Sequence, residues 1–281
     1  MALLTGRAKA RREPDAVLEA FRAWLPDSVT IAEPSGARVV ALDGAKLPGL
    51  TLKGSFGPGA HLILWGGFQP SAEVPVTIRA RRSVPDDLMI GIGPVESGAV
   101  TINVVGQGGR LAVGASRKMH LTCNLLHDSE VVFGDDTTTE RAAVTCRHGH
   151  VRLGRDCMLS SDVEIDAAQH HGLVDLSGDT PRLDDRPSGV TVGDHVWLGK
   201  TSMLIGRASV GSGSIIGAGS VFAGAAPANT ALAGNPAKVL RESVTWSRKY
   251  DAIDPATLGY ISTLQGTGPA SAAAGFEETA Q

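Results

Sequence analysis

Aromatic residues are scarce in this sequence of 281 residues, of which Phe, Tyr and Trp together make up 4%. An excess of one charge is also lacking, because the net charge is −3 and acidic and basic residues are interspersed. Surfaces that bind nucleic acids combine clustered Lys and Arg with rings that stack on bases. We therefore expect no nucleic-acid partner.

Long hydrophobic runs are missing as well. No stretch approaches the roughly 18 consecutive apolar residues that a membrane-spanning helix needs. The basic segment Met1–Arg12 is not followed by the apolar core of a signal peptide. The sequence thus predicts a cytoplasmic protein without a membrane span.

Cysteine is rare, with only Cys123, Cys146 and Cys157, and no two of them form a CxxC pair. An odd number of scattered cysteines is typical of reduced thiols that fill small core positions. A reactive thiol is the alternative.

Glycine, by contrast, is abundant, with 35 residues. Many glycines and few large rings are typical of a fold made of narrow repeated coils. Apolar residues recur at every sixth position at Val192, Leu198, Leu204, Val210, Ile216 and Phe222. The same phase occurs upstream at Leu153, Leu159 and Ile165, and at Val113, Met119, Leu125 and Val131. A small or medium residue follows four positions later at Val196, Ser202, Ala208, Ser214 and Ser220.

A period of six matches neither the α-helix, at 3.6 residues, nor the alternating strand, at 2. It matches a triangular prism in which three hexads form one coil and each apolar residue points inward. The small residue then fits beside the corner, and stacked coils pair as parallel strands about 4.8 Å apart. The pattern predicts an all-β parallel β-helix over residues 99–236.

The N-terminal part is less regular. Apolar residues at helical spacing predict a helix over Asp15–Leu25, which ends before Pro26. Between Ser28 and Val95, short apolar runs alternate with Gly and Pro turns, which indicates strands of a β-rich cap or irregular first coils. Residues 1–98 are therefore expected to form a separate N-terminal region of unknown role.

The C-terminal part leaves the repeat at Asn235-Pro236. The segment Ala237–Tyr250 looks helical, so a short C-terminal helical segment is expected within 237–264. Residues 265–281 are rich in Gly, Ala, Thr and Ser and are expected to form a disordered tail.

The repeat is interrupted once by a long segment, because the spacing from Ile165 to Val192 is long and is not a multiple of six. A loop over 168–190 therefore leaves the prism, and it opens on Gln169-His170-His171. Loops on rigid scaffolds often carry functional groups, and imidazole suits a general base at neutral pH. Two solvated loop histidines are the alternative.

Three motifs between Val131 and Trp246 resemble those of the hexapeptide-repeat O-acetyltransferases that modify bacterial capsule and lipopolysaccharide sugars. Ile165–Asp175 is similar to that family's segment ending in His-Ser-Ile-x-Asp. Val192–Gly199, which reads VGDHVWLG, is similar to its IGDxVWIG signature, and Gly234–Arg241, GNPAKVLR, matches the motif that closes its β-helix. The resemblance implies a left-handed β-helix, a homotrimer with CoA held between neighbouring prisms, and acetyl-CoA as the co-substrate.

The resemblance also implies roles for the loop residues. His171 matches the catalytic histidine, which would take the proton from an acceptor hydroxyl as its oxygen attacks the thioester. Asp175 would fix the imidazole tautomer, although a backbone carbonyl could do the same. Gln169 replaces an acidic residue common in the family, and Gln169 and His170 are expected to meet the acceptor.

For the donor, the resemblance implies that Lys238 and Arg241 meet the CoA phosphates and that Trp197 forms a wall for the pantetheine arm or the sugar. The alternatives are a solvated pair of cations and a core aromatic ring. Small residues at repeat corners would let the pantetheine approach the backbone: Gly199, Ala218 and Gly219.

Other functions remain open at this point. An N-acetyltransferase acting on an amino-sugar nucleotide would use the same fold and base. A non-catalytic scaffold is kept open by two departures from the family: Gln169, and Ala223-Gly224 where a Thr-Lys pair is often found. A zinc carbonic anhydrase needs three converging imidazoles, and the eight histidines contain no His-x4-His pair, so no metal is expected. The sequence names neither the acceptor sugar nor any acyl group other than acetyl.

Overall fold

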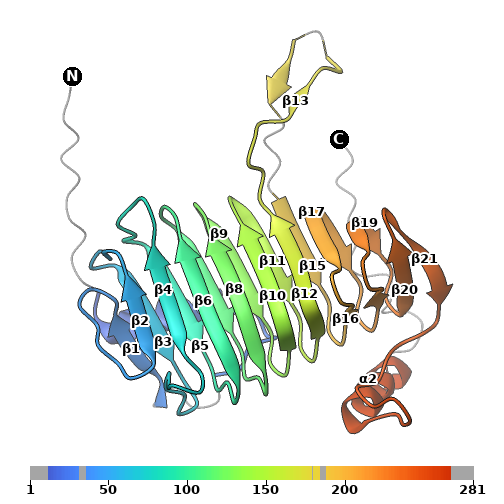
Figure 1. Cartoon of the computed structure of the whole chain (residues 1–281), viewed down its shortest axis with the longest axis horizontal. Helices are drawn as coiled ribbons and strands as arrows, with labels where there is room; N and C mark the ends of the chain where they lie inside the picture. Colours follow the sequence, from blue (N-terminus) through green and yellow to red (C-terminus); the bar gives the residue numbers. More distant parts are fainter. Residues whose placement is uncertain (1–11, 32–35, 179, 184–187, 267–281) are drawn as a thin grey trace.

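Short strands stacked along one axis make up most of the computed structural model, which describes residues 12–31, 36–178, 180–183 and 188–266 (Figure 1). One 19-stranded sheet contains, in its first half, β1 (Arg38–Ala41), β2 (Leu50–Lys53), β3 (Ala60–Leu64), β4 (Val76–Ala80), β5 (Leu88–Ile92), β6 (Gly98–Val104), β7 (Gly109–Val113), β8 (Met119–Leu125), β9 (Ser129–Phe133) and β10 (Thr138–Cys146). Its second half contains β11 (Gly149–Leu153), β12 (Met158–Ala167), β15 (Ser188–Val192), β16 (Trp197–Leu198), β17 (Met203–Val210), β18 (Ile215–Ile216), β19 (Val221–Ala226), β20 (Thr230–Gly234) and β21 (Ala237–Glu242). A separate sheet contains β13 (Val174–Asp175) and β14 (Arg182–Leu183), and the helices are α1 (Pro14–Trp24) and α2 (Pro255–Gly266). Neither described helix is long and apolar enough to span a membrane.

The predicted parallel β-helix is confirmed by the strand pairing. In the C-terminal coils, Val190 pairs in parallel with Ala208, which lies three hexads further along the chain. The same step joins Leu198 to Ile216 and Met203 to Val221 on two other faces. Three hexads therefore close one coil, and a coil has three faces that we name by these pairs: face A (190/208), face B (198/216) and face C (203/221).

The interior of the prism is made of the residues that the six-residue period selects. All thirteen predicted apolar positions are at most 5% exposed, Phe222 having the largest value. The small positions are buried too, and the hydroxyl groups of Ser214 and Ser220 form hydrogen bonds at the corners where the coil turns. Ser214 Oγ, for example, donates to the Pro227 carbonyl and accepts from the Thr230 amide. Both parts of the repeat pattern therefore have a packing cause.

The N-terminal region consists of irregular first coils. β2 pairs in parallel with β4, Leu50 meeting Val76, and β3 pairs with β5, Ala60 meeting Leu88. Both steps along the chain are longer than four hexads, so the six-residue period does not extend to these coils. The parallel pairing continues across residue 98, because β4 pairs with β6 and β5 with β7.

The predicted N-terminal helix is confirmed as α1, which covers the outer side of face A in these first coils. Val17 and Phe21 are buried against outward-facing apolar residues of the strands, namely Ile63, Trp65, Met89, Ala112 and Val132. A Cβ on Gly91 would lie 2.1 Å from the Phe21 ring, so the helix sits where β5 has no side chain. Face A is thus closed by the chain itself in its N-terminal half.

The prediction of a helix over Ala237–Tyr250 was wrong. The last coil ends in a strand with an open edge, whose amide and carbonyl groups need partners. The chain reverses at Asn235-Pro236, and β21 pairs antiparallel with β20. The short C-terminal helix is α2, which begins after Asp254, whose Oδ1 accepts from the amides of Ala256 and Thr257. Residues 265 and 266 belong to α2, and the rest of the expected tail lies outside the described residues.

The cysteines are core residues, as predicted. Cys123, Cys146 and Cys157 are free thiols in the prism interior, each with no exposed surface. Burial raises the pKa of Cys146 to about 11 and that of Cys157 to about 12. Because the thiolate is the reactive form, these positions exclude the alternative of a reactive thiol.

Candidate active site

The loop predicted between β12 and β15 is the longest excursion between paired strands in the described residues. Val151 pairs with Val190, more than six hexads further along the chain, whereas the longest of the first coils stays below five hexads. The excursion forms a hairpin of β13 and β14 that stands away from the prism (Figure 1). Large apolar side chains on it are half exposed or more: Leu173, Val174, Leu176 and Leu183. Among the described residues, none covers these side chains as such side chains are normally covered.

His170 and His171 lie at the base of this hairpin and are both exposed. The carboxylate next to them comes from β12: Asp166 Oδ2 is 3.8 Å from His170 Nε2. Asp166 is itself held in place, because its Oδ1 accepts from the Ala168 amide at 3.1 Å. Sequence reasoning missed Asp166, although its position on the last strand before the loop is the signal that could have found it.

Asp175, the predicted partner of His171, has contacts within the hairpin. Its Oδ1 accepts from the amide and the hydroxyl of Ser177, at 2.9 and 2.6 Å, and its Oδ2 is 3.5 Å from Arg182 Nε. These contacts tie the two hairpin strands together. A role for Asp175 in orienting His171 therefore stays a prediction, as does contact of Gln169 with an acceptor.

The small residues predicted to meet the pantetheine arm lie together at the corner between faces B and C. A Cβ on Gly199 would lie 2.6 Å from the Ala218 amide nitrogen of the next coil. The Gly219 amide donates to the Lys200 carbonyl, and Gly219 has a positive φ of 69°. Corner stacking alone therefore requires Gly199, and the same packing leaves Ala218 and Gly219 exposed as a strip of bare backbone.

Trp197 is half-buried on face B, immediately before this corner. Its Nε1 donates to Ser160 Oγ at 3.0 Å, and its ring centroid is 6.3 Å from that of Trp246. The ring is therefore on the outside of β16 and does not fill the prism, which removes the core alternative.

Lys238 lies at the C-terminal end of the same corner. It is opposite Ala233 in the β20–β21 pair. Ala233 in turn stacks on the corner residue Gly217 of the preceding coil, because a Cβ on Gly217 would be 2.9 Å from Ala233 Cβ. Arg241 lies opposite Ala231 on the same edge strand, and both cations are exposed. The predicted donor residues thus follow one corner of the prism through successive coils. We call them the corner row: Trp197, Gly199, Ala218, Gly219, Lys238 and Arg241.

The histidines and the corner row lie at different edges of the prism. Face C separates them, because residues 164–166 of β12 pair there with residues 203–205 of β17, between the corner row and the loop. In one chain, His171 and Trp197 are therefore at opposite ends of a face.

A third edge, between faces A and B, holds a histidine that sequence reasoning did not single out. His195 is 1% exposed, and its Nδ1 is 2.7 Å from Asp156 Oδ2. Its Nε2 is 3.1 Å from the Trp246 carbonyl, and the ring is stacked against those of Trp246 and Tyr260. Both nitrogens face acceptor oxygens, so this His–Asp pair has no nitrogen free to take a proton from a substrate. It is a structural pair, and no spacing in the sequence indicates it.

Arg248 completes this cluster. Its Nε and one terminal nitrogen donate to Asp156 Oδ1 at 3.1 and 2.7 Å, and its other terminal nitrogen donates to Thr138 Oγ1. Burial would raise the pKa of Asp156, but the hydrogen bonds from His195 and Arg248 outweigh it and lower that pKa. Asp156 therefore ties the C-terminal segment to the prism as an ionised carboxylate. Within the described ranges, no group of three or more His, Cys, Asp and Glu side chains is arranged as a metal site.

Comparison with known proteins places this geometry in a class. Residues 189–224 match the family model of the bacterial transferase hexapeptide (six repeats). Residues 189–224 are therefore similar to bacterial hexapeptide transferase repeats. The crystal structure of the polySia-specific acetyltransferase NeuO is similar over 77% of this chain and 95% of its own, with a TM-score of 0.62 and 22% identity. This likeness shows the fold, which is the left-handed parallel β-helix that the resemblance implied.

Sequence relatives match part of the chain. The chain is 38% identical to the galactoside O-acetyltransferase of Escherichia coli K12 over 94 residues, 33% of this chain and 44% of the relative. It is 28% identical to the polysialic acid O-acetyltransferase of Neisseria meningitidis over 133 residues, 47% of this chain and 61% of the relative. The chain thus spans about half the length of the curated relatives that it matches.

Proposed function

We propose that this chain transfers an acetyl group from acetyl-CoA to a hydroxyl group of a sugar or polysaccharide. The observation that carries the proposal is the position of His170 and His171. They open the longest excursion between paired strands in the described residues, and the sequence relatives of the chain include named sugar O-acetyltransferases. Exposed imidazoles at the base of a loop are accessible to a hydroxyl group, whereas the buried His195 is not.

In this proposal, His171 is the general base. Its neutral imidazole takes the proton from the acceptor hydroxyl while the oxygen attacks the thioester carbonyl. The carbonyl then re-forms, the bond to sulfur breaks, and the imidazolium returns the proton to the departing CoA thiolate. One C–O bond replaces one C–S bond, and no metal or redox partner is required. His170, held near Asp166, and Gln169 would contact the acceptor.

The corner row would hold the donor. Its exposed backbone at Ala218 and Gly219 runs toward the cations of β21, so an extended ligand can follow successive coils about 4.8 Å apart. Acetyl-CoA has this shape, with a thioester at one end and phosphates at the other. Because face C separates His171 from the corner row, we propose that the loop of one protomer meets the corner row of its neighbour in a homotrimer.

The proposal is tested by measuring thiol release from acetyl-CoA with the purified full chain against sugars, sugar nucleotides and oligosaccharides. Transfer to oxygen gives an ester, which mild alkali cleaves, whereas transfer to an amino group gives a stable amide. An ester product is expected. An amide product would favour the N-acetyltransferase, and no transfer to any acceptor class would favour the scaffold.

Replacing both Lys238 and Arg241 with Ala is expected to weaken acetyl-CoA binding by roughly tenfold to a hundredfold. Each charge-assisted contact with a phosphate contributes about 1.5–3 kcal/mol when buried and less at exposed positions such as these. Titration calorimetry with acetyl-CoA and with dephospho-CoA measures the effect. Lys46→Ala/Lys53→Ala, which removes two exposed lysines of the first coils, is the control. Unchanged affinity in the Lys238/Arg241 variant would place the phosphates elsewhere.

Light scattering of the native chain is expected to give about three times its 29.0 kDa mass. Exposed aliphatic side chains on the hairpin need cover, which a neighbouring copy can supply. Leu173→Ser/Leu176→Ser should therefore shift the protein toward the monomer. Leu258→Ser, at an exposed leucine of α2, should leave the mass unchanged. A monomeric native chain would contradict the shared donor site.

A further inference from the structure

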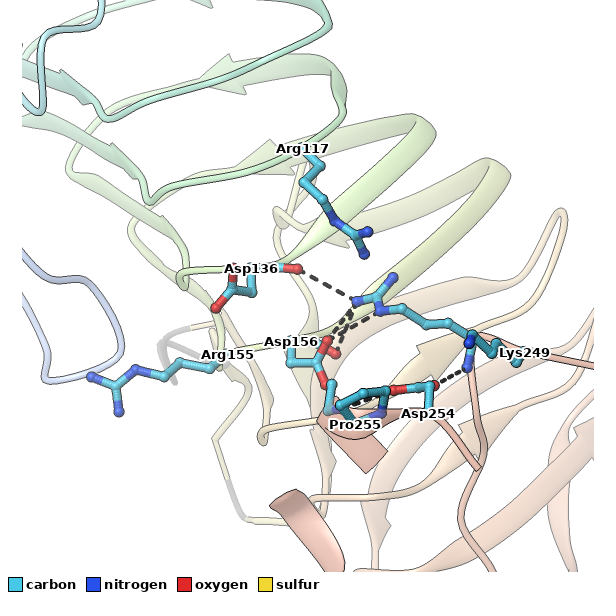
Figure 2. A pocket seen from close by; sticks show the side chains of 9 residues that line it. Arg117, Asp136, Arg155, Asp156, Lys249, Asp254 and Pro255 are labelled. Carbon is cyan, nitrogen blue, oxygen red and sulfur yellow. Dashed lines mark hydrogen bonds and ion pairs between the residues drawn. The ribbon is translucent and has the colours of Figure 1, made fainter. Parts of the chain in front are cut away.

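A pocket of about 690 Å³ opens at the third edge of the prism, between faces A and B (Figure 2). One wall is formed by successive coils and the other by the C-terminal segment with the first turn of α2. Polar and charged residues dominate its lining, which consists of Arg117, Asp136, Arg155, Asp156, Arg248, Lys249, Asp254, Pro255 and Ala256. Its volume is within the range of about 300–1,000 Å³ that small-molecule sites have. It contains neither the loop histidines nor the corner row.

Two of the three carboxylates in the pocket are occupied by the protein itself. Asp156 accepts from Arg248 and faces His195. Asp254 accepts from Ser247 Oγ, Thr257 Oγ1 and the Arg248 amide, in addition to capping α2. Burial alone would raise the pKa of Asp254, but these hydrogen bonds lower it well below its ordinary range. Neither carboxylate needs a further cation.

The cations, in contrast, are mostly uncompensated. In the part of the chain that the structure describes, the side chains of Arg117 and Lys249 have no hydrogen bond or ion pair. Arg155 donates to the backbone carbonyl of Asp27, which neutralises no charge. Figure 2 shows Arg117 pointing into the pocket from the prism wall, whereas Arg155 points away from the Asp156 carboxylate. Lys249 lines the pocket from the C-terminal segment, so cations on both walls border one space.

We infer that this pocket is a binding site for an oxyanion, a carboxylate or a phosphate, carried by a hydrophilic ligand. The lining holds four cations and three carboxylates, and among the described residues Arg117 and Lys249 have no ion pair, so the local balance favours a negative group. A guanidinium fork matches the oxygens of carboxylate or phosphate, and an ammonium group adds a point charge from the other side.

The site is separate from the proposed transfer site. Acetyl-CoA in the corner row would lie at the edge between faces B and C, and the loop leaves the prism between faces C and A. A ligand in the pocket therefore neither competes with the donor within one chain nor touches the base. Binding of this ligand can be measured without catalytic turnover, so the inference can be tested independently of the proposed acetyl transfer.

The test is titration calorimetry of the full chain at low ionic strength with three probes: inorganic phosphate, oligogalacturonate and acetyl-CoA. Arg117→Gln/Lys249→Gln is expected to weaken binding of the oxyanion probe by roughly tenfold or more, since one charge-assisted bond corresponds to about that factor. Lys46→Gln/Lys53→Gln, a change of the same size in the first coils, should have no effect. Methyl-esterified oligogalacturonate, which lacks the charge, should not bind to the pocket.

The probes distinguish the sources of the oxyanion. Pocket-dependent binding of oligogalacturonate alone would indicate an acidic sugar, and that of phosphate alone would indicate a phosphate-bearing ligand; both outcomes support the inference. Equal affinity of the native chain and the Arg117/Lys249 variant for both probes would overturn it. A loss of acetyl-CoA affinity in that variant would also overturn it, because the pocket would then belong to the donor site. Unchanged thermal unfolding of the variant excludes a folding defect.

Discussion

Replacing His171 with Ala is expected to lower the rate of acetyl transfer by about 10²–10⁴-fold, the loss typical of a missing general base. The fold and the oligomeric mass should stay intact, because His171 is exposed at the base of a hairpin outside the prism core. Initial rates of thiol release from acetyl-CoA measure the effect.

His170→Ala is the matched control, because it removes an identical exposed ring at the neighbouring position. A much smaller effect is expected from it. The structure makes this comparison sharper, since Asp166 lies beside His170 and Asp175 is held within the hairpin. If His170→Ala were inactive and His171→Ala fully active, the base would be His170 with Asp166 as its orienting carboxylate. Full activity of both variants and of the double variant would contradict the histidine mechanism.

The residues of the prism interior could be predicted because they recur at a fixed spacing in the sequence. Where a coil is three hexads long, an inward-pointing residue occurs at every sixth position, and residues 18 apart, such as Leu198 and Ile216, pair in adjacent coils. Toward the N-terminus the coils lengthen: the step from Val131 to its partner Val151 slightly exceeds three hexads, and the step from Ala60 to Leu88 exceeds four. Extra residues at a corner leave the inward positions in place but destroy their spacing. The same fold therefore gives no hexad signal before residue 99.

The residues of the candidate site could be predicted only where they lie close together in the sequence. The loop histidines and the corner residues belong to local motifs, so their positions could be inferred from the chain. Asp166, by contrast, is opposite His170 because a strand ends there. His195 meets Trp246 from a segment 51 residues away, and Arg248 reaches Asp156 over 92. Such contacts depend on how β21 reverses the chain, which hydrophobic spacing does not encode.

The cluster around Asp156 should be the most sensitive point of this C-terminal attachment. Asp156→Asn removes the charge that Arg248 and His195 share, while Asn tolerates the left-handed backbone at this position, where φ is 52°. Breaking a buried ion pair lowers the free energy of unfolding by about 3–5 kcal/mol. Because the side chains of Asp156 and Arg248 remain 21% and 16% exposed, we expect Asp156→Asn to lower it by about 2–3 kcal/mol. Urea unfolding measures this decrease, and proteolysis within residues 243–266 should become faster.

Asp136→Asn is the matched control, since Asp136 has the same backbone conformation one coil away and, among the described residues, its carboxylate has no ion pair. It should change stability by less than about 0.5 kcal/mol. The pH dependence gives a second test. The pKa of Asp156 is lowered in the folded chain, so its contribution is complete above the ordinary value of 3.8 and is lost as the pH falls through the folded value. The stability difference between the native chain and Asp156→Asn should therefore be full at neutral pH and shrink below about pH 4. A difference that is equally large at acid pH would show that the carboxylate acts through its shape and not through its charge.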